Sequence, residues 1–527
     1  MTVATAPAEL TLRRLFVGAL DRFGDRPAVV FAGRTWSYAE IVRDANRLAH
    51  VLVAAGVTPG TPVAIMMSNC VEWVVADQAI IRAGAAKVPV NDMLSASEIG
   101  YILRDSGAVV ALADAGLVDA ALGAGSAALR TVIVVGEPVA GTRSWDEVLA
   151  SAPDGVTDGG PPEADVTGSD VGIIAYTGGT TGRQKGVVHT QRGLAVNILA
   201  HVVEMGLLDD ERLLLTSPLP HSAGFLTQAG LLKGALHLVE RRFDPDLVLD
   251  RIERDRATFL FMVPTMIYRV LDAAGRRDVD LTSLRTILYG AAPITLERLE
   301  QGLRRLGPVF MQLYGQSEAP NFLTRLTRED HDLAHPERLG SCGRAATLAE
   351  IAVLDDDGVP VESGRPGEIC ARAPYVMEGY LGLPDKTAET LRGGWLHTGD
   401  LGRMDADGYV HLLDRKHDMI ISGGMNVYST EVENVVQTAP GVAQVAVVGI
   451  PHPDWGEAVV AFVVTTAEPD TDHQEGSAFD EAATTAACRA ELAAYKRPKA
   501  YRRVAELPVT AFGKVDKKAL RASWPGW

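Results

Sequence analysis

Cysteine is scarce in this chain: four residues in 527, with no Cys-x-x-Cys pair among them. The pattern predicts neither a zinc site nor a disulfide framework, and favours free buried thiols at Cys70, Cys342, Cys370 and Cys488. The chain also lacks a run of eighteen apolar residues and a basic N-terminal leader with an apolar segment behind it. We therefore expect no membrane span, and we expect a cytoplasmic protein.

Basic residues are also fewer than acidic residues. Lysine and arginine number 50 against 67 acidic residues, which gives a formal net charge of −17. This balance argues against a nucleic-acid-binding protein, which usually carries a basic face. An anionic substrate would need local positive groups, because the overall field repels it.

The length and the pattern of elements predict several α/β layers. A chain of 527 residues exceeds one ordinary core, and 47% hydrophobic residues are typical of a globular enzyme. Ser37-Tyr-Ala-Glu40 is a capping-box pattern that predicts a helix to about Ala55. Apolar strands alternate with helices from there on, at 63–67 and 85–90, for example.

The composition changes near residue 414. Beyond it the pattern predicts a helix at 431–438, strands at 442–450 and 457–466, and a helix at 480–494, with a polar loop around 468–476. We therefore expect a large N-terminal domain of layered α/β subdomains over 1–414. A small C-terminal α/β domain is expected over 415–527.

A loop rich in glycine and threonine follows the apolar strand expected at 171–176. Glycines let backbone N–H groups approach an anion, threonines donate hydrogen bonds, and a lysine neutralises charge. The residues that predict a polyphosphate site here are Thr177, Gly178, Gly179, Thr180, Thr181, Gly182 and Lys185. The spacing is not that of a Walker A loop, because Lys185 precedes Gly186 rather than Ser or Thr.

An acidic residue follows a second strand, in Tyr314-Gly-Gln-Ser-Glu-Ala319. Glu318 suits Mg²⁺, which prefers one or two carboxylates together with phosphate oxygens. A hydrolase nucleophile elbow is the rival interpretation. It requires glycine where Ala319 stands, and it does not explain the phosphate loop.

Together these motifs resemble, in their order, the adenylate-forming superfamily of acyl-CoA synthetases, stand-alone adenylation enzymes and luciferases. The resemblance covers about residues 12–521, although relatives usually have proline where Gln184 stands. It implies that Tyr314 and Gly315 lie along the adenine, that Ser317 contacts the α-phosphate and that Glu318 binds magnesium. It also places adenine and the acyl pocket beside the small residues Gly290, Ala291, Ala292 and Pro293.

Other positions gain a role from the same resemblance. Asp400, in Gly-Trp-Leu-His-Thr-Gly-Asp, is implied to accept from the ribose hydroxyls, and Arg415 to reach the ribose or a phosphate. His221 is implied to line the acid-binding side, although relatives often have an aromatic residue where Pro220 stands.

The C-terminal region supplies the expected moving parts. Lys514 matches the adenylation lysine of the family, with Lys517 and Lys518 as solvated neighbours. His417 occupies the hinge position, where relatives usually have Asp or Lys. Gly423 and Gly424 would leave a path free of side chains for the pantetheine arm of coenzyme A.

The sequence thus predicts a ligase that uses ATP, Mg²⁺ and coenzyme A to convert a small carboxylic acid into an acyl-adenylate and then an acyl-CoA. Lys514, Glu318 and His221 are its candidate catalytic residues. The alternative is a stand-alone adenylating enzyme that passes the acyl group to a separate carrier protein, an amine or nitrite. A degenerate ATP-binding module is disfavoured by the joint presence of Glu318, Asp400, Arg415 and Lys514. Which acid is used is left open, and so is a homodimer.

Overall fold

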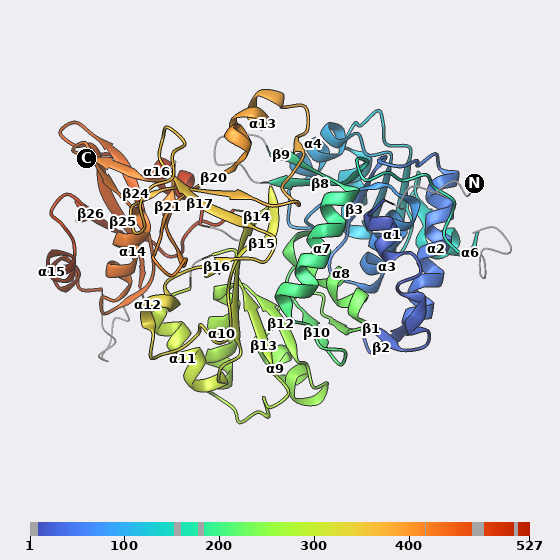
Figure 1. Cartoon of the computed structure of the whole chain (residues 1–527), viewed down its shortest axis with the longest axis horizontal. Coiled ribbons are helices and arrows are strands. Elements are labelled where there is room, and N and C mark those ends of the chain that lie inside the picture. Colours follow the sequence, from blue (N-terminus) through green and yellow to red (C-terminus); the bar gives the residue numbers. More distant parts are fainter. Residues whose placement is uncertain are drawn as a thin grey trace, which may run out of the picture. The chain divides into compact units, whose positions relative to one another are not determined.

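The computed structural model describes residues 9–151, 160–177, 184–292, 294–416, 418–465, 479–510 and 515–527. The chain forms two compact units, one of Met1–Ile351 with Ala371–Leu396 and one of Ala352–Cys370 with His397–Trp527. Sheets covered by helices build both units, which confirms the predicted α/β class (Figure 1). The predicted boundary at 414/415 lies inside the second unit and stays a prediction.

The first sheet of unit 1 has a parallel centre and antiparallel edges. Its order in the described residues is β16-β15-β14-β13-β12-β10-β11-β1-β2. The strands are β1 (Pro27–Phe31), β2 (Arg34–Ser37), β10 (Arg212–Leu215), β11 (Leu236–Val239), β12 (Phe259–Met262), β13 (Thr286–Tyr289), β14 (Phe310–Gln316), β15 (Ala319–Leu326) and β16 (Arg344–Ala345). Since β13 and β14 run parallel, their carboxyl ends lie at the same edge of the sheet.

The second sheet of unit 1 ends in a hairpin. Its order in the described part of the chain is β19-β9-β8-β4-β3-β5-β6-β7, and β8, β9 and β19 pair antiparallel. The strands are β3 (Pro62–Met66), β4 (Ala86–Pro89), β5 (Val110–Asp114), β6 (Thr131–Val135), β7 (Arg143–Ser144), β8 (Val171–Thr177), β9 (Lys185–Thr190) and β19 (Gly379–Tyr380). Strand β19 is added from a segment almost 200 residues after β9.

Helices fill the space between these sheets and cover their outer faces. The helices of unit 1 are α1 (Leu12–Phe16), α2 (Tyr38–Ala54), α3 (Val71–Ala83), α4 (Ala96–Ser106), α5 (Val118–Leu122), α6 (Trp145–Ala150), α7 (Gln191–Met205), α8 (Gly224–Lys233), α9 (Pro245–Arg254), α10 (Pro264–Ala274), α11 (Leu296–Leu306), α12 (Pro336–Leu339) and α13 (Pro384–Thr390). One core combines α2, α3, α7 and α8 with strands of both sheets. A second core joins α9, α10 and α11 to the opposite face of the first sheet (Figure 1).

The burial of α3 follows from its sequence. Every residue of this mostly apolar helix except Glu72 is buried, and its buried polar residues have partners, Asp77 with Lys87 and Arg82 with Asn46 and Gln78. The helix ends at Gly84, which has a left-handed φ of 70°. A Cβ at Gly84 would lie 2.3 Å from Val166 Cγ2, so both conformation and space require glycine there.

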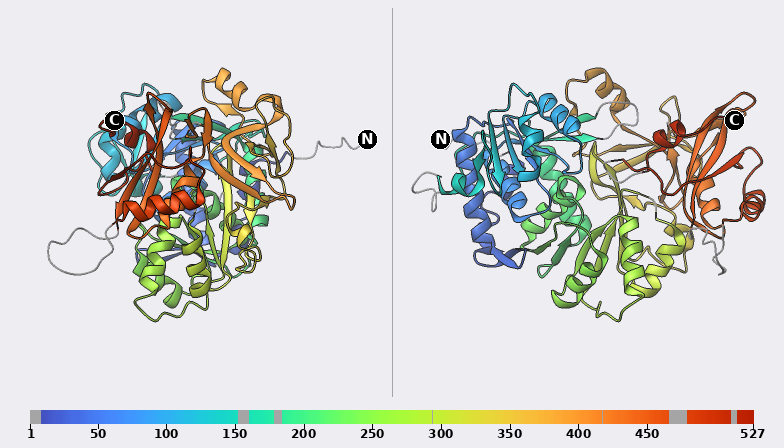
Figure 2. Two further views of the ribbon diagram at one scale, coloured as in Figure 1. Left: turned by 90° about the vertical axis from the view of Figure 1, so that its left-hand side faces the viewer. Right: turned by 180° about the vertical axis from the view of Figure 1, so that it is seen from behind.

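Unit 2 contains a sheet with helices on both faces. Strands β22 (Ile420–Ser422), β23 (Met425–Val427), β24 (Val442–His452), β25 (Gly456–Thr465) and β26 (Ala500–Arg503) form it. Helices α14 (Ser429–Gln437) and α15 (Glu481–Glu491) pack on one face, and α16 (Lys517–Ala522) on the other (Figure 2). A smaller sheet of β17 (Glu350–Leu354), β18 (Gly367–Arg372), β20 (Leu396–Met404) and β21 (Val410–Arg415) precedes it in the chain.

Local sequence signals are confirmed where they are strong. Helix α2 begins after Ser37, and both hydrogen bonds of the capping box with Glu40 form. The elements predicted after residue 414 are present as α14, β24, β25 and α15, although α15 ends at Glu491. The polar loop expected around 468–476 lies outside the described residues. The four cysteines are buried thiols outside any disulfide, as predicted. Among the described helices none is both long and apolar enough to cross a bilayer.

Unit 1 buries four histidines that stay neutral at pH 7. Burial lowers the pKa of His189, His201, His237 and His331 to about 4 in each case. An unfolded histidine titrates near about 6.5, so the unfolded chain binds more protons than the folded chain between these two pH values.

We expect the free energy of unfolding of unit 1 to fall as the pH is lowered from about 6.5 towards 4. Each buried histidine contributes a slope of up to about 1.4 kcal/mol per pH unit. Urea midpoints measured across this range test the effect. His237→Asn should reduce the slope, and His335→Asn, which changes an exposed histidine, should leave it unchanged. Equal slopes in all three proteins would contradict the assignment.

Candidate functional site

The predicted phosphate loop lies at the turn of the β8–β9 hairpin. Thr177 ends β8 and pairs directly with Lys185, the first residue of β9. The intervening Gly178, Gly179, Thr180, Thr181 and Gly182 lie outside the described residues. Gly186 needs to be small, because a Cβ there would lie 2.9 Å from Ile174 Cγ2. The ammonium of Lys185, at the start of β9, lies 4.5 Å from the centroid of the Tyr380 ring.

Gln184 stands where relatives usually have proline, and side chains of helix α4 bond to it. The hydroxyl of Tyr101, on α4, donates to the carbonyl of Gln184 at 3.0 Å. A side-chain bond from Gln184 Nε2 to Glu98 Oε1 at 3.5 Å adds a second connection to α4. These contacts supply restraint where a proline ring would have limited φ.

The segment from Tyr314 to Glu318 turns between β14 and β15. A Cβ on Gly315 would lie 2.7 Å from the backbone of Asn321, so the turn closes only with glycine at this position. Tyr314 is buried, and Ser317 and Glu318 are half-buried. Glu318 accepts a hydrogen bond through Oε1 from the hydroxyl of Tyr380 at 2.6 Å.

Two side chains connect this turn to the phosphate hairpin. The Nε2–H of His189, on β9, donates to the carbonyl of Ser317 at 2.7 Å. Tyr380, on β19, bonds Glu318 and also carries Lys185 Nζ 4.5 Å from its ring centroid. The structure thus brings together the predicted residues Thr177, Lys185, Ser317 and Glu318.

Sequence reasoning missed both His189 and Tyr380. The sequence feature beside Tyr380 is Gly379. A Cβ on Gly379 would lie 2.7 Å from Thr387 Cγ2, so this position needs glycine. Nothing local links Tyr380 to Glu318, which is 62 residues away. The pairing of β19 with β9 creates this contact.

The small residues after β13 lie beside the same turn. Gly290 is buried, and a Cβ on it would lie 2.6 Å from the carbonyl oxygen of Leu313. Ala291 and Ala292 follow and are exposed, with Ala291 at a left-handed φ of 67°. Pro293 lies outside the described residues. That adenine and the acyl pocket lie beside these small residues stays a prediction.

His221 lies in an irregular turn, Leu219–Ala223, between β10 and α8. Its backbone departs from helical geometry, with φ −111° and ψ −147°. His221 Nε2 lies 2.8 Å from Asn91 Nδ2, which follows β4 of the other sheet. Asn321 Nδ2 contacts His201 Nε2 at 2.8 Å and the carbonyl of Ser222 at 3.4 Å. His221 is thereby fixed by both sheets of unit 1.

In unit 2, two predicted nucleotide residues are direct neighbours. Asp400 on β20 pairs with Arg415 on β21, and Arg415 Nε lies 2.8 Å from Asp400 Oδ1. Asp400 is buried, whereas Arg415 is 42% exposed in its side chain. One oxygen of Asp400 therefore neutralises the guanidinium, and the carboxylate keeps a defined orientation.

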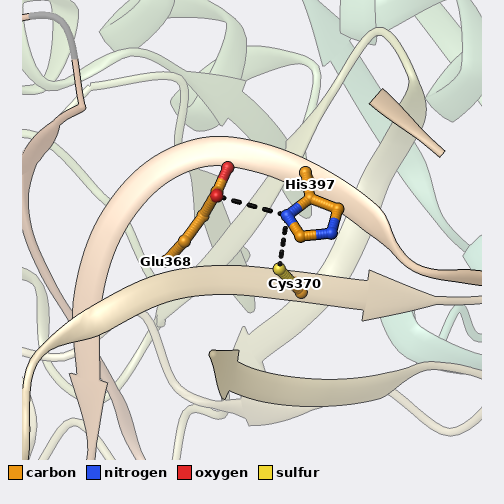
Figure 3. A group of neighbouring side chains, drawn as sticks. All are labelled: Glu368, Cys370 and His397. Atoms are coloured by element: carbon orange, nitrogen blue, oxygen red, sulfur yellow. Dashed lines mark hydrogen bonds and ion pairs between the residues drawn. The ribbon is translucent and has the colours of Figure 1, made fainter. Parts of the chain in front are cut away.

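Glu368, Cys370 and His397 form a buried cluster, of which His397 lies on β20 shortly before Asp400 (Figure 3). His397 Nδ1 lies 3.2 Å from Glu368 Oε2 and 3.3 Å from Cys370 Sγ. Sulfur, nitrogen and oxygen within reach of one another are a donor set that suits zinc. However, Gly399 N–H donates to Glu368 Oε1 at 3.1 Å, and the ammonium of Lys416 lies 3.5 Å from Oε2.

Both oxygens of Glu368 therefore already have protein partners, one of them a cation. Burial raises the pKa of Glu368, but the hydrogen bonds and the charge of Lys416 outweigh burial and hold this pKa below its usual value. We interpret the cluster as a charged support that fixes the segment before Asp400 to β18. A metal ion would have to displace Lys416.

The region around the predicted hinge is held on both sides. His417 lies outside the described residues, but Lys416 N–H donates to the carbonyl of Gly399 at 2.8 Å. Asp418 pairs with Arg521 Nη2 at 3.0 Å. Lys514 also lies outside the described residues. Lys517 is not the solvated neighbour that was expected, because Lys517 Nζ pairs with Glu433 at 2.9 Å.

Gly423 and Gly424 form the turn of the β22–β23 hairpin. Both have a left-handed φ, 61° and 78°, which a two-residue hairpin of this twist requires. A Cβ on Gly423 would approach Trp455 Cε3 to 3.3 Å, while a Cβ on Gly424 meets nothing within 4 Å. Lys499 Nζ lies 4.4 Å from the ring of Trp455, which is 38% exposed.

Comparison with known proteins agrees with this arrangement. Residues 16–381 match the family described as AMP-binding enzyme, and residues 431–514 match the AMP-binding enzyme C-terminal domain. A medium/long-chain-fatty-acid–CoA ligase of Mycobacterium tuberculosis is 37% identical over 518 residues, covering 97% of this chain and 90% of that protein. A feruloyl-CoA synthase of Amycolatopsis sp is 40% identical over 500 residues, covering 94% and 95%.

A solved structure shows the same similarity in three dimensions. The amide bond synthetase McbA from Marinactinospora thermotolerans superposes with a TM-score of 0.86 at 32% identity, covering 97% of this chain and 99% of that one. Both domain matches occur in chain order, and the relatives match over nearly the whole length. The chain therefore belongs to the adenylate-forming AMP-binding enzymes and is an acid–thiol ligase.

Proposed function

We propose that this ligase acts on an apolar monocarboxylic acid, a medium-chain or arylpropenoic acid. The carboxylate of the acid attacks the α-phosphate of ATP, which gives the acyl-adenylate and releases pyrophosphate. The acyl group is then transferred to the thiol of coenzyme A, and AMP is released. The similarity to a fatty-acid ligase and to a feruloyl-CoA synthase supports both acid classes.

The observation that carries the proposal is the character of the turn around His221. Leu219, Pro220 and Ala223 are buried apolar residues, and Phe225 follows them at the start of α8. A cation beside this turn is Lys87, whose Nζ lies 5.9 Å from the centroid of the Phe225 ring. Lys87 is already paired with buried Asp77, so it does not offer its charge to a second carboxylate of the substrate.

The chain's own residues meet the charge problem of adenylation. Both reactants are anions, and cations with aligned donors must be aimed at the oxygens where negative charge gathers. We assign Thr177 and Lys185, with the loop between them, to the β- and γ-phosphates. Asp400 is assigned to the ribose hydroxyls, and Lys514 to the oxygens at the reacting phosphorus.

Glu318 fits the expected magnesium ion. Its Oε1 accepts from Tyr380, which orients the carboxylate and leaves Oε2 as a ligand, and hard oxygen ligands suit Mg²⁺. When bound, the ion would neutralise phosphate charge during the first half-reaction. His189 and Tyr380 hold the turn that carries this carboxylate at a fixed distance from β9.

The surface beside Gly423 suits the nucleotide end of coenzyme A. An exposed indole offers a stacking face to adenine, and the ammonium of Lys499 above it offers a charge to phosphate. The similarity to an amide bond synthetase supports an amine as the alternative acceptor. A separate carrier protein would present the same pantetheine thiol.

A panel of acids tests the substrate class. ATP–pyrophosphate exchange should be fast with octanoate and ferulate, and at least about tenfold slower with the corresponding dicarboxylates, because Lys87 beside this turn is already paired with Asp77 and does not offset a second carboxylate. Free coenzyme A should then accelerate AMP release with the good acids. If exchange occurs and AMP release responds to an amine or a carrier protein but not to coenzyme A, the proposed acceptor is wrong. The proposed first half-reaction would still hold.

Lys514 is tested by separating the two half-reactions. Lys514→Ala should reduce pyrophosphate exchange by about 100- to 1,000-fold, the usual effect of removing one preorganised donor. Thioester formation from a synthetic acyl-adenylate should stay near the wild-type rate. Lys518→Ala, four residues away, is the control. Normal exchange in Lys514→Ala would reject this lysine as the catalytic one.

The hairpin at Gly424 is tested by filling the open space beside it. Gly424→Leu should slow AMP release with coenzyme A by at least about tenfold, while exchange stays near normal. The left-handed φ of 78° adds backbone strain, so Gly358→Leu serves as control, with a φ of 77° and equally open surroundings. If both variants lose the coenzyme A step equally, strain and not obstruction is the cause.

A further inference from the structure

The segment Met377–Leu381 ties the two halves of the phosphate site together through its backbone. At one end Met377 N–H donates to the carbonyl of Glu318 at 2.8 Å. At the other end Leu381 N–H donates to the carbonyl of Gly186 at 2.8 Å, and Tyr380 pairs with Val187. The segment therefore runs from the turn that carries the magnesium candidate to the strand that begins at Lys185.

The side chain of Tyr380 repeats this connection. Its hydroxyl donates to Glu318 Oε1 at 2.6 Å, a length typical of a strong bond to a charged acceptor. Its ring carries the ammonium of Lys185 at 4.5 Å from the centroid, within the range of a cation–π contact. Tyr380 thus contacts Lys185, the predicted phosphate-binding lysine, with the face of its ring. With its hydroxyl it contacts Glu318, the predicted metal ligand.

The position of Tyr380 is itself tightly fixed. Tyr380 is buried, and its backbone N–H donates to Thr387 Oγ1 at 2.9 Å. Gly379 allows Thr387 this approach. Burial and the neighbouring charge of Glu318 raise the pKa of the phenol, so the hydroxyl stays a donor throughout the neutral and alkaline range.

We propose that Tyr380 is a positioning residue for adenylation, which orients Glu318 for Mg²⁺ and keeps Lys185 apart from that carboxylate. This inference rests on the proposed roles of Glu318 and Lys185. Lys185 and Glu318 both contact Tyr380, and a direct ion pair between them would use the charges that the phosphates and the metal ion need. The ring gives Lys185 a neutral partner instead. The hydroxyl restricts Glu318 to the rotamer in which Oε2 remains open.

The two contacts of Tyr380 are separable by mutation. Tyr380→Phe keeps the ring and removes the bond to Glu318, so the Mg²⁺ concentration for half-maximal pyrophosphate exchange should rise by about tenfold, with kcat at saturating Mg²⁺ changed much less. Tyr380→Leu removes the ring as well and should additionally raise KM for ATP. Thioester formation from a synthetic acyl-adenylate needs neither contact and should stay near normal in both.

Two further variants distinguish the possible failures. Tyr38→Phe is the matched control, because it removes another buried hydroxyl in unit 1, one that donates to the carbonyl of Ala235 at 2.8 Å. Its Mg²⁺ dependence should equal that of the wild type. Glu318→Gln tests the underlying assignment and should show a stronger defect in Mg²⁺ dependence than Tyr380→Phe.

A wild-type Mg²⁺ dependence in Tyr380→Phe beside an impaired Glu318→Gln would overturn the role of Tyr380 and leave that of Glu318 intact. If Glu318→Gln is also normal, the proposed metal site itself fails. If Tyr380→Phe loses exchange and thioester formation equally, with a lower melting temperature by circular dichroism, Tyr380 has only a structural role and the inference is rejected.

Discussion

The pairing of β19 with β9 is the constraint on which the unit 1 site depends. It places Tyr380 opposite Val187 and so brings a segment from near residue 380 to a hairpin near residue 185. Glu318 joins from a third part of the chain, through the hydroxyl of Tyr380 and the backbone of Met377. The proposed phosphate cation and the proposed metal carboxylate would be useful only if they do not pair with each other. Tyr380 offers each of them a partner, its ring to Lys185 and its hydroxyl to Glu318.

The sequence could predict the parts of this site better than their connections. The hydrogen bonds of Ser37 and Glu40, and the strand before Thr177, depend on neighbours in the chain, so local patterns identify them. The contact between Tyr380 and Glu318 depends on packing across 62 residues, and no local pattern encodes it. The sequence indicates Gly423 and Gly424 by the space they leave, and the structure adds that both have left-handed φ values, which favour glycine. Lys517 was misjudged because its partner, Glu433, lies on another helix.

Buried polar groups set the shape of unit 1 near the acid side at a cost in stability. Asp77 holds Lys87 and accepts two bonds from Gln228, at 3.0 and 2.9 Å, in a region that is otherwise apolar. Replacing such a pair by apolar residues is often neutral or stabilising, so its presence points to a requirement for a defined geometry. The chain Asn197–His201–Asn321 and the contact between Asn91 and His221 have the same character. These bonds join helices α7 and α8 to strands of both sheets, where the acid is expected.

The residues that orient each candidate site residue lie in the same compact unit as that residue. Glu318 and Lys185 are held by Tyr380 and His189, all in unit 1, while Asp400 is held by Arg415 and the Glu368 cluster, all in unit 2. Lys416, the residue before the proposed hinge, contributes to the unit 2 cluster through both its ammonium and its backbone. Arg415, Glu368 and Lys416, which orient Asp400, all precede His417 in the chain, so a rotation at this proposed hinge would not need to break their bonds. The bonds that orient Glu318 lie wholly in unit 1. The proposed withdrawal of Lys514 between two half-reactions would require such independence, because the groups that orient Glu318 and Asp400 must keep their contacts while Lys514 moves.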